Sequence, residues 1–218
     1  MDAELPAKFS IEWMQWQSEL SQLNHIRIPR WNNFSPEVTL SEIPGFADSS
    51  KLAYEAALHL RVYSRSAITT SLVISKSKVA TLKVMSIPRL ELSAAFLLAK
   101  LTHYYINICH FAVHSVRLWT DLADVLYWLE GQSSKWPVFV ANRCLLIHEM
   151  LPKAQWHHLR LKETPANIIL RDRSAKGLIN HNIYGGMDLP FSLIRFNRGQ
   201  THRKVLLSQL KCLNPLAI

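Results

Sequence analysis

The spacing of apolar residues changes along this chain, and that change most constrains the fold. Between Ala53 and Tyr63 apolar side chains alternate with their neighbours, as in a strand that buries one face. Between Leu90 and Ile108 they recur every three or four residues, which is the period of a helix. A chain that passes from strands to a long helix in this way is expected to form an α/β domain in which helices cover a sheet.

The same reasoning places further elements on both sides. Strands are predicted at Ile43–Ser50 and Ser71–Ser75, close enough to the strand at Ala53–Tyr63 to form an antiparallel meander. Ser86 suits the cap of the long helix and Pro88 its first turn. The later predicted elements are a strand at Val113–Trp119, helices at Asp121–Leu129 and Val138–His148, and a strand at Trp156–Leu161. The sheet is therefore expected to be mixed.

The first 35 residues predict a helical lead-in. Trp13, Trp16, Leu20 and Leu23 recur at helical spacing and so share one face. The helix should end before Ile28-Pro29, because the residue before a proline resists helical geometry. Exposed tryptophans are costly, so we expect this face to pack on something, and a domain outside the chain is one candidate.

The composition is that of a globular protein: of 218 residues, 49% are hydrophobic and 19% charged. No stretch reaches the roughly 18 uninterrupted apolar residues of a membrane span, and no signal peptide is recognisable at the start. Cys109, Cys144 and Cys212 lie far apart, which disfavours a disulfide framework or a cysteine-rich zinc site. We therefore expect an intracellular protein, cytoplasmic or nuclear, that is not secreted and has no membrane partner.

The formal charge is +9, which favours a polyanion as partner. From Arg171 to the end of the chain there are eight Lys or Arg residues and only two Asp or Glu. This basic segment could contact nucleic acid or could be a solvated connector, and its composition does not separate the two.

Three acidic residues occupy positions from which they could converge. Asp48 lies at the end of the first predicted strand, Glu91 in the first turns of the long helix, and Asp121 directly after the fourth strand. Carboxylate oxygens are the ligands that hard divalent cations prefer, and two ions about 4 Å apart can promote phosphodiester cleavage. Acids at strand ends are also common as solvated caps, and Asp121 could cap the helix Leu122–Leu129.

Several segments resemble, in order, the ribonuclease H domains of Bel/Pao retrotransposons. The most specific is the run from Val79 to Leu92. The others are Gly45–Ser50 with Ala53-Tyr54, Trp119-Thr120-Asp121, Trp136 with Phe139–Arg143, Trp156-His157-His158 and Lys162–Asn167. The lead-in from Trp13 to Arg30 is similar to the connection between reverse transcriptase and ribonuclease H. The resemblance covers about residues 9–190.

This resemblance implies a ribonuclease-H-like fold: a five-stranded mixed sheet, three strands antiparallel and then two parallel, flanked by helices. It implies three parts: a helical connection segment at 1–42, the ribonuclease-H-like domain at 43–178 and a basic extension at 179–218. The implied chemistry is hydrolysis of RNA in RNA–DNA hybrids with Mg²⁺ or Mn²⁺. Asp48, Glu91 and Asp121 match three catalytic, metal-binding acids.

The fourth metal position of the family, normally Asp, is Asn167 in this chain. Asn offers one neutral carbonyl oxygen, so it would hold a second ion more weakly. Leu122 and the ending 168–173 also depart from the family pattern, and Asp172 is more simply a solvated acid than a replacement ligand. We expect a catalytically impaired domain; the alternative is an active ribonuclease H.

Other candidate residues follow from the same resemblance. His158 matches a position from which a histidine could assist proton transfer or product release, although a histidine at a strand edge is often structural. His157 stands beside it with the same two interpretations. The candidates for nucleic-acid binding are Arg89, Lys162, Arg171 and Arg173.

Other activities lack their motifs. The chain has no phosphate-binding GxxxxGK[ST] loop, no GxGxxG, no Asp-Thr-Gly or Asp-Ser-Gly of an aspartic protease, and no Tyr-x-Asp-Asp of a reverse transcriptase. The protease motif matters because Pao-type sequences often have a peptidase label. We therefore expect a polyprotein fragment, or a decayed copy of one, that retains at most ribonuclease H activity and nucleic-acid binding. Its expected partners are an RNA–DNA hybrid or other nucleic acid, and the missing reverse transcriptase portion.

Overall fold

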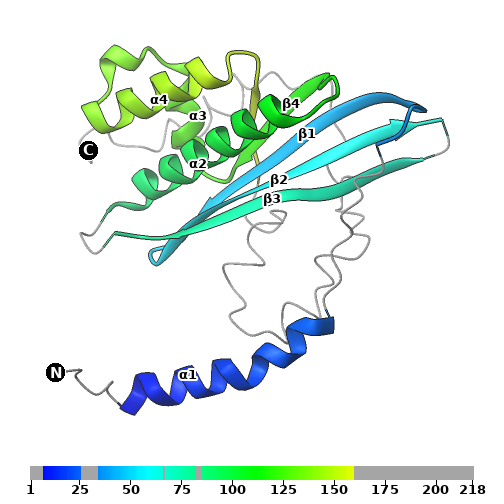
Figure 1. The fold of residues 1–218 in the computed structure, drawn as a ribbon. Helices are drawn as coiled ribbons and strands as arrows, with labels where there is room; N and C mark the ends of the chain where they lie inside the picture. The colour runs from blue at the N-terminus through cyan, green and yellow to red at the C-terminus, as the bar shows by residue number, and fades with distance from the viewer. Residues whose placement is uncertain (1–6, 26–33, 66, 82–84, 160–218) are drawn as a thin grey trace.

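The computed structural model describes residues 7–25, 34–65, 67–81 and 85–159. Five strands form one mixed sheet in the order β3-β2-β1-β4-β5 (Figure 1). The strands are β1 (Val38–Ser49), β2 (Ala53–Ser64), β3 (Ile68–Val79), β4 (Ser115–Thr120) and β5 (Gln155–His158). The first three are antiparallel neighbours, whereas β4 runs parallel to β1 and β5 parallel to β4. This is the predicted ribonuclease-H-like sheet.

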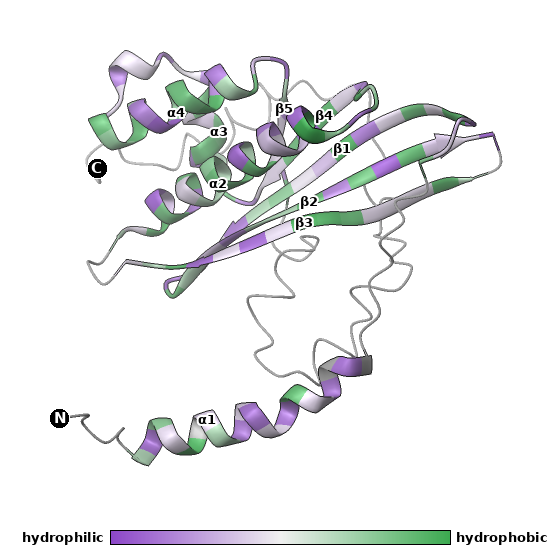
Figure 2. Cartoon of the chain, viewed as in Figure 1, coloured by the Kyte–Doolittle hydropathy of each residue, from purple (hydrophilic) through white to green (hydrophobic). Residues whose placement is uncertain are grey.

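The helices follow the predicted order. They are α2 (Ile87–Ile108), α3 (Ala123–Glu130), η2 (Ser133–Lys135) and α4 (Val138–Met150). The long helix α2 packs on β1, β2 and α4. Apolar and polar residues alternate along it (Figure 2), and its apolar residues complete the main core. No helix in the described ranges combines the length and apolar character needed to cross a membrane.

Helix α2 packs closely on β1 at Gly45. Gly45 lies in β1, and a Cβ atom built there would stand 2.8 Å from both Leu98 Cδ1 and Leu118 Cδ2. Leu98 and Leu118 are fully buried. The absent side chain therefore lets α2 approach the sheet closely, beside the strand end that carries Asp48.

The opposite face of the sheet has its own cluster of Phe46, Trp119 and Leu159. Phe46 stacks on Trp119 with ring centroids 5.1 Å apart, as expected for parallel neighbours that are in register. Because residues in a strand alternate between faces, Asp48 shares the face of Phe46 and not that of Gly45.

Several predicted boundaries were wrong. Strand β1 begins at Val38 and not at Ile43, since its first residues pair with the end of β2. Strand β3 extends beyond the predicted apolar segment at both ends because it continues to pair with β2, and β5 ends before Leu161. The middle of β2 is buried on both faces, whereas the alternation of apolar residues predicted a strand with only one buried face.

Of the two predicted helix caps, one is confirmed and one is wrong. Ser86 is the N-cap residue of α2, as predicted, and its side chain makes no capping hydrogen bond. Asp121 is not the cap of α3, because that helix begins at Ala123 and its N-cap is Leu122. Asp121 therefore stands one position before the cap, where its carboxylate is available for other contacts.

The predicted lead-in helix is present as α1 (Ala7–Glu19), followed by η1 (Leu20–His25). It lies apart from the sheet in Figure 1. Trp13 and Trp16 stack on each other at 5.2 Å but are 54% and 48% exposed. Trp13 and Trp16 of the predicted face therefore lie side by side, and about half of each side chain remains exposed. The predicted helix end before Ile28-Pro29 falls outside the described residues.

Candidate metal centre

The fold brings the three acids predicted from the sequence together. Asp48 is the penultimate residue of β1, and Asp121 follows β4, which is paired in parallel with β1 through Ala47 and Thr120. Glu91 lies in the first turns of α2, which packs on β1. One carboxylate oxygen from each of the three lies within 4.8 Å of the others. The site thus combines a strand end, a neighbouring strand end and a helix start.

Ser49 holds two of these carboxylates. Its backbone N–H donates to Asp48 Oδ1 at 2.7 Å and to Glu91 Oε1 at 3.1 Å. Its hydroxyl donates to the same Glu91 oxygen at 2.7 Å. One residue at the end of β1 therefore fixes the carboxylate of Glu91 beside that of Asp48.

The cluster contains buried oxygens without a hydrogen-bond donor. Glu91 Oε2 and Asp121 Oδ1 are both buried, and neither has a hydrogen-bond partner. Burial raises the pKa of Glu91 from its usual 4.5 to about 9, and the charge of Asp121 adds to this effect. Burial also raises the pKa of Asp121. These carboxylates repel each other unless a proton or a cation lies between them.

The cluster is a set of carboxylates in which one oxygen of Glu91 and one of Asp121 are buried without a donor. Orphaned oxygens of this kind suit a hard divalent cation, which prefers carboxylate ligands. Asp48, Glu91 and Asp121 therefore fit a hard divalent cation as its protein ligands.

Comparison with known proteins identifies the family. A family model described as "Pao retrotransposon-like RNaseH-like domain" matches residues 1–122. The chain belongs to this family. No curated protein matches the Pao domain described here.

Solved structures similar to this Pao domain include ribonucleases H and a foamy viral enzyme. An RNase H1 from compost, LC11, solved with an RNA/DNA hybrid, shares 8% identity over 57% of this chain and 88% of its own, with a TM-score of 0.39. RNase H1 of Halobacterium salinarum shares 13% identity over 64% of this chain and 98% of its own, with a TM-score of 0.37. A foamy viral protease-reverse transcriptase, also solved with an RNA/DNA hybrid, shares 12% identity over 80% of this chain and 26% of its own, with a TM-score of 0.36. These scores are low, so the fold assignment rests on the family match and the strand order.

The two candidate histidines of the Pao domain lie on different faces of β5. His158 Nε2 is 2.9 Å from the backbone oxygen of Asp121, so His158 contacts the main chain beside the cluster. His157 lies on the other face, its ring 5.4 Å from that of Trp119. The structure therefore places His158 next to the site and His157 in the aromatic cluster.

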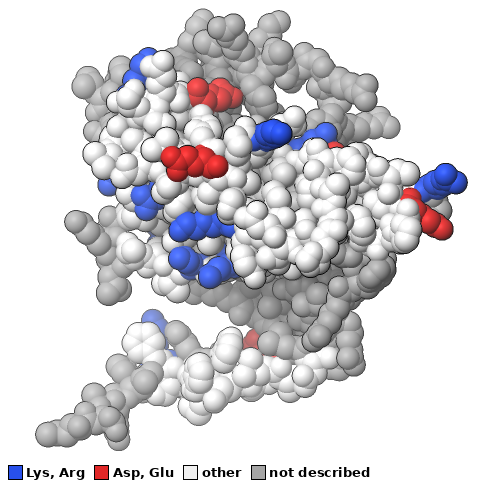
Figure 3. Space-filling view, turned by 45° about the horizontal axis from the view of Figure 1, so that its top comes forward, with Lys and Arg blue, Asp and Glu red and all other residues white. Residues whose placement is uncertain are grey.

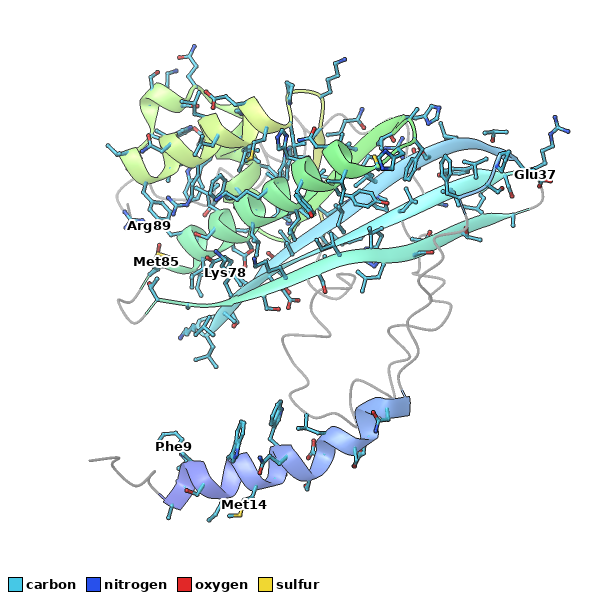
Figure 4. All side chains as sticks on the ribbon, in the orientation of Figure 1. Phe9, Met14, Glu37, Lys78, Met85 and Arg89 are labelled. Atoms are coloured by element: carbon cyan, nitrogen blue, oxygen red, sulfur yellow. The ribbon has the colours of Figure 1, made fainter. Side chains whose placement is uncertain are left out.

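Arg89 is an exposed residue in the first turn of α2, at the same end of the domain as Lys78 and Met85 (Figure 4). Its guanidinium lies over the ring of Phe139 at 5.2 Å, and Arg143 lies over the same ring at 3.5 Å. Lys and Arg side chains also gather at one side of the face drawn in Figure 3. The remaining candidates, Lys162, Asn167, Arg171 and Arg173, lie outside the described residues, as does the basic extension.

Sequence reasoning missed Ser49 and also Glu55, which β2 places directly opposite Asp48. Glu55 is only 2% exposed. Burial raises its pKa from 4.5 to about 8, with a further contribution from the charge of Asp48. The sequence did contain a signal for Glu55, which is a single acid inside an apolar strand. Burying an acid is costly unless it has a partner.

Proposed function

We propose that this Pao domain binds RNA–DNA hybrids and hydrolyses their RNA strand slowly, using divalent cations held by Asp48, Glu91 and Asp121. The observation that carries this proposal is the convergence of three acids, two of which, Glu91 and Asp121, have a buried oxygen without a hydrogen-bond partner. The fold and the family agree with it.

Each residue has a definite part in this proposal. When bound, divalent cations supply an activated water and stabilise the leaving oxygen of the phosphodiester. Ser49 holds the Glu91 carboxylate in place through its N–H and hydroxyl. The backbone carbonyl of Asp121 accepts from His158 in its Nε2–H tautomer, which makes His158 a positioning residue for Asp121.

Contact with nucleic acid is assigned to the basic side chains. Arg89 is exposed two positions before Glu91, so a phosphate held by Arg89 would lie close to the start of α2. Lys162, Arg171 and Arg173 are proposed for the same role from the sequence alone.

The slow rate is assigned to Asn167, which would bind a cation more weakly than an aspartate. The alternative is a ribonuclease H of full activity. Incubating the purified full chain with a labelled RNA–DNA hybrid in Mg²⁺ and in Mn²⁺ separates them. Slow cleavage that is lost in Asp48→Asn and increased in Asn167→Asp supports the proposal, and fast cleavage in the unaltered chain supports the alternative. No cleavage in either metal, or cleavage that survives Asp48→Asn, overturns the assignment of a hydrolase.

That the domain belongs to a polyprotein with a reverse transcriptase portion stays a prediction. The exposed Trp13 and Trp16 of α1 favour a contact with such a portion. Reading frames in the flanking genomic DNA test it: polymerase motifs upstream are expected, and their absence would contradict the prediction.

A further inference from the structure

Glu55 approaches Asp48 from the side that Asp121 leaves open. Strand β1 lies between β2 and β4, so Glu55 and Asp121 come from strands on opposite sides of Asp48. Asp48 and Glu55 are directly opposite in the antiparallel register. Opposite residues point to the same face, with Cβ atoms about 4.5–5.5 Å apart. The two carboxylates therefore share one small region of the sheet.

Glu55 has too few partners for a buried acid. Its Oε1 atom is buried and has no hydrogen-bond partner, and its Oε2 atom accepts one long hydrogen bond of 3.4 Å from Ser77. Burying a carboxyl group without hydrogen-bond partners costs free energy, and more so when the group is charged. Two opposed carboxylates add repulsion to that cost.

Glu42 shows how the same pair of strands accommodates a structural acid. Glu42 is also buried, but Arg117 forms an ion pair with it at 3.3 Å, and Tyr63 and Ser115 donate to it at 2.7 and 3.0 Å. Every oxygen of Glu42 is therefore satisfied. Glu55 lacks such a set of donors, and it stands directly opposite Asp48, whose carboxylate lies close to those of Glu91 and Asp121.

We propose that Glu55 is a further metal ligand, which with Asp48 forms a second cation position next to the one made by Asp48, Glu91 and Asp121. Asp48 would then be shared by two ions, as required for a pair held about 4 Å apart. Glu55, on β2, would then supply a fourth carboxylate in place of the aspartate that the family has at the position of Asn167. This inference rests on the proposed metal-dependent function and adds a ligand to it.

Metal binding to the full chain tests the inference without relying on activity. Mn²⁺ titrations by calorimetry are compared for the unaltered chain, Glu55→Gln, Asp48→Asn and the control Asp124→Asn. Asp124 is a half-buried acid in the first turn of α3 that is not part of the cluster. We expect two ions for the unaltered chain and for Asp124→Asn, and one for Glu55→Gln. Loss of an outer partner already weakens metal binding 10–100-fold, so loss of a direct ligand should weaken the second ion at least about tenfold.

Thermal unfolding gives a second test, because Glu55→Gln should change the melting temperature in opposite directions if Glu55 is a metal ligand and if it is structural. Without metal, Glu55→Gln should unfold at the same or a higher temperature, because a neutral amide replaces a buried acid that has too few hydrogen-bond partners opposite Asp48; with Mn²⁺ its gain in stability should be smaller than that of the unaltered chain. A lower melting temperature without metal, together with unchanged Mn²⁺ binding, overturns the inference and makes Glu55 structural. If Glu55→Gln binds two ions while Asp48→Asn binds none, the proposed function stands and the role of Glu55 falls. If the unaltered chain binds no Mn²⁺, both fall.

Discussion

Ser49 donates twice to one oxygen of Glu91, from its hydroxyl at 2.7 Å and from its backbone N–H at 3.1 Å. The contact links the end of β1 to the start of α2, which are 42 residues apart in the chain. It fixes the carboxylate that the sequence predicted as a metal ligand through a residue that the sequence did not single out.

Replacing Ser49 with Ala should therefore weaken metal binding more than it weakens the fold. The substitution removes the hydroxyl bond but keeps the backbone bond, so the loss of unfolding free energy should be at most about 1 kcal/mol. Mn²⁺ affinity should fall roughly tenfold, as for other outer partners of metal ligands. Calorimetry and thermal unfolding measure the two effects, and Ser49→Thr, which keeps a hydroxyl, is the control. Equal Mn²⁺ affinity in Ser49→Ala would show that the hydroxyl does not position Glu91.

The metal-free domain should lose stability as the pH rises. The pKa of Glu91 is raised from 4.5 to about 9 and that of Glu55 from 4.5 to about 8. Between those values the folded state retains protons that the unfolded state has released, so the free energy of unfolding falls with increasing pH. Denaturant titrations in EDTA across this range should show the fall, and the double variant Glu55→Gln, Glu91→Gln should flatten it. A profile identical in the variant and the unaltered chain would contradict the raised pKa values.

His59 should produce a loss of stability at acid pH. It is buried, its ring lies edge-on to Phe46 at 5.7 Å, and burial lowers its pKa from 6.5 to about 4. Between these values the unfolded state binds a proton that the folded state does not, so stability is lost as the pH falls from 6.5 towards 4. Denaturant titrations of His59→Leu should show a weaker dependence in that range. The prediction fails if the variant and the unaltered chain lose stability in parallel.

Gly45→Ala should destabilise the domain by about 1–3 kcal/mol, because the new Cβ atom overpacks the contact between β1 and α2. Leu98→Ala alone should cost about 2–5 kcal/mol by leaving a cavity. In the double variant the removed leucine atoms make room for the new methyl group. Its loss in urea titrations should therefore be smaller than the sum of the two single losses, and strict additivity would contradict the close approach at Gly45.

The sequence was sufficient to predict which elements form and that three acids converge. Periodicity separates the strands from α2, and acids placed at strand ends and a helix start meet once the sheet forms. It could not supply the register of β1 against β2, because a shift by one residue would move Glu55 to the other face. That register is fixed by a tight turn, in which the N–H of Ser50 donates to the Ala53 oxygen at 2.7 Å. The helix start at Ala123 was also beyond the sequence, since Asp121 suits an N-cap position far better than Leu122, which occupies it.

The pairing of β1 with β4 has a consequence for the order of folding. Glu42 and Ser115 are partners in it although 73 positions separate them. The three antiparallel strands are adjacent in the chain and can associate after closing short loops, whereas Asp121 arrives only when a much longer loop has closed. A cation that needs all three acids would therefore bind only after β4 has paired with β1. Bound metal should accordingly slow unfolding and leave the early steps of folding unchanged, so that metal occupancy would report the docking of the second half of the sheet on the first.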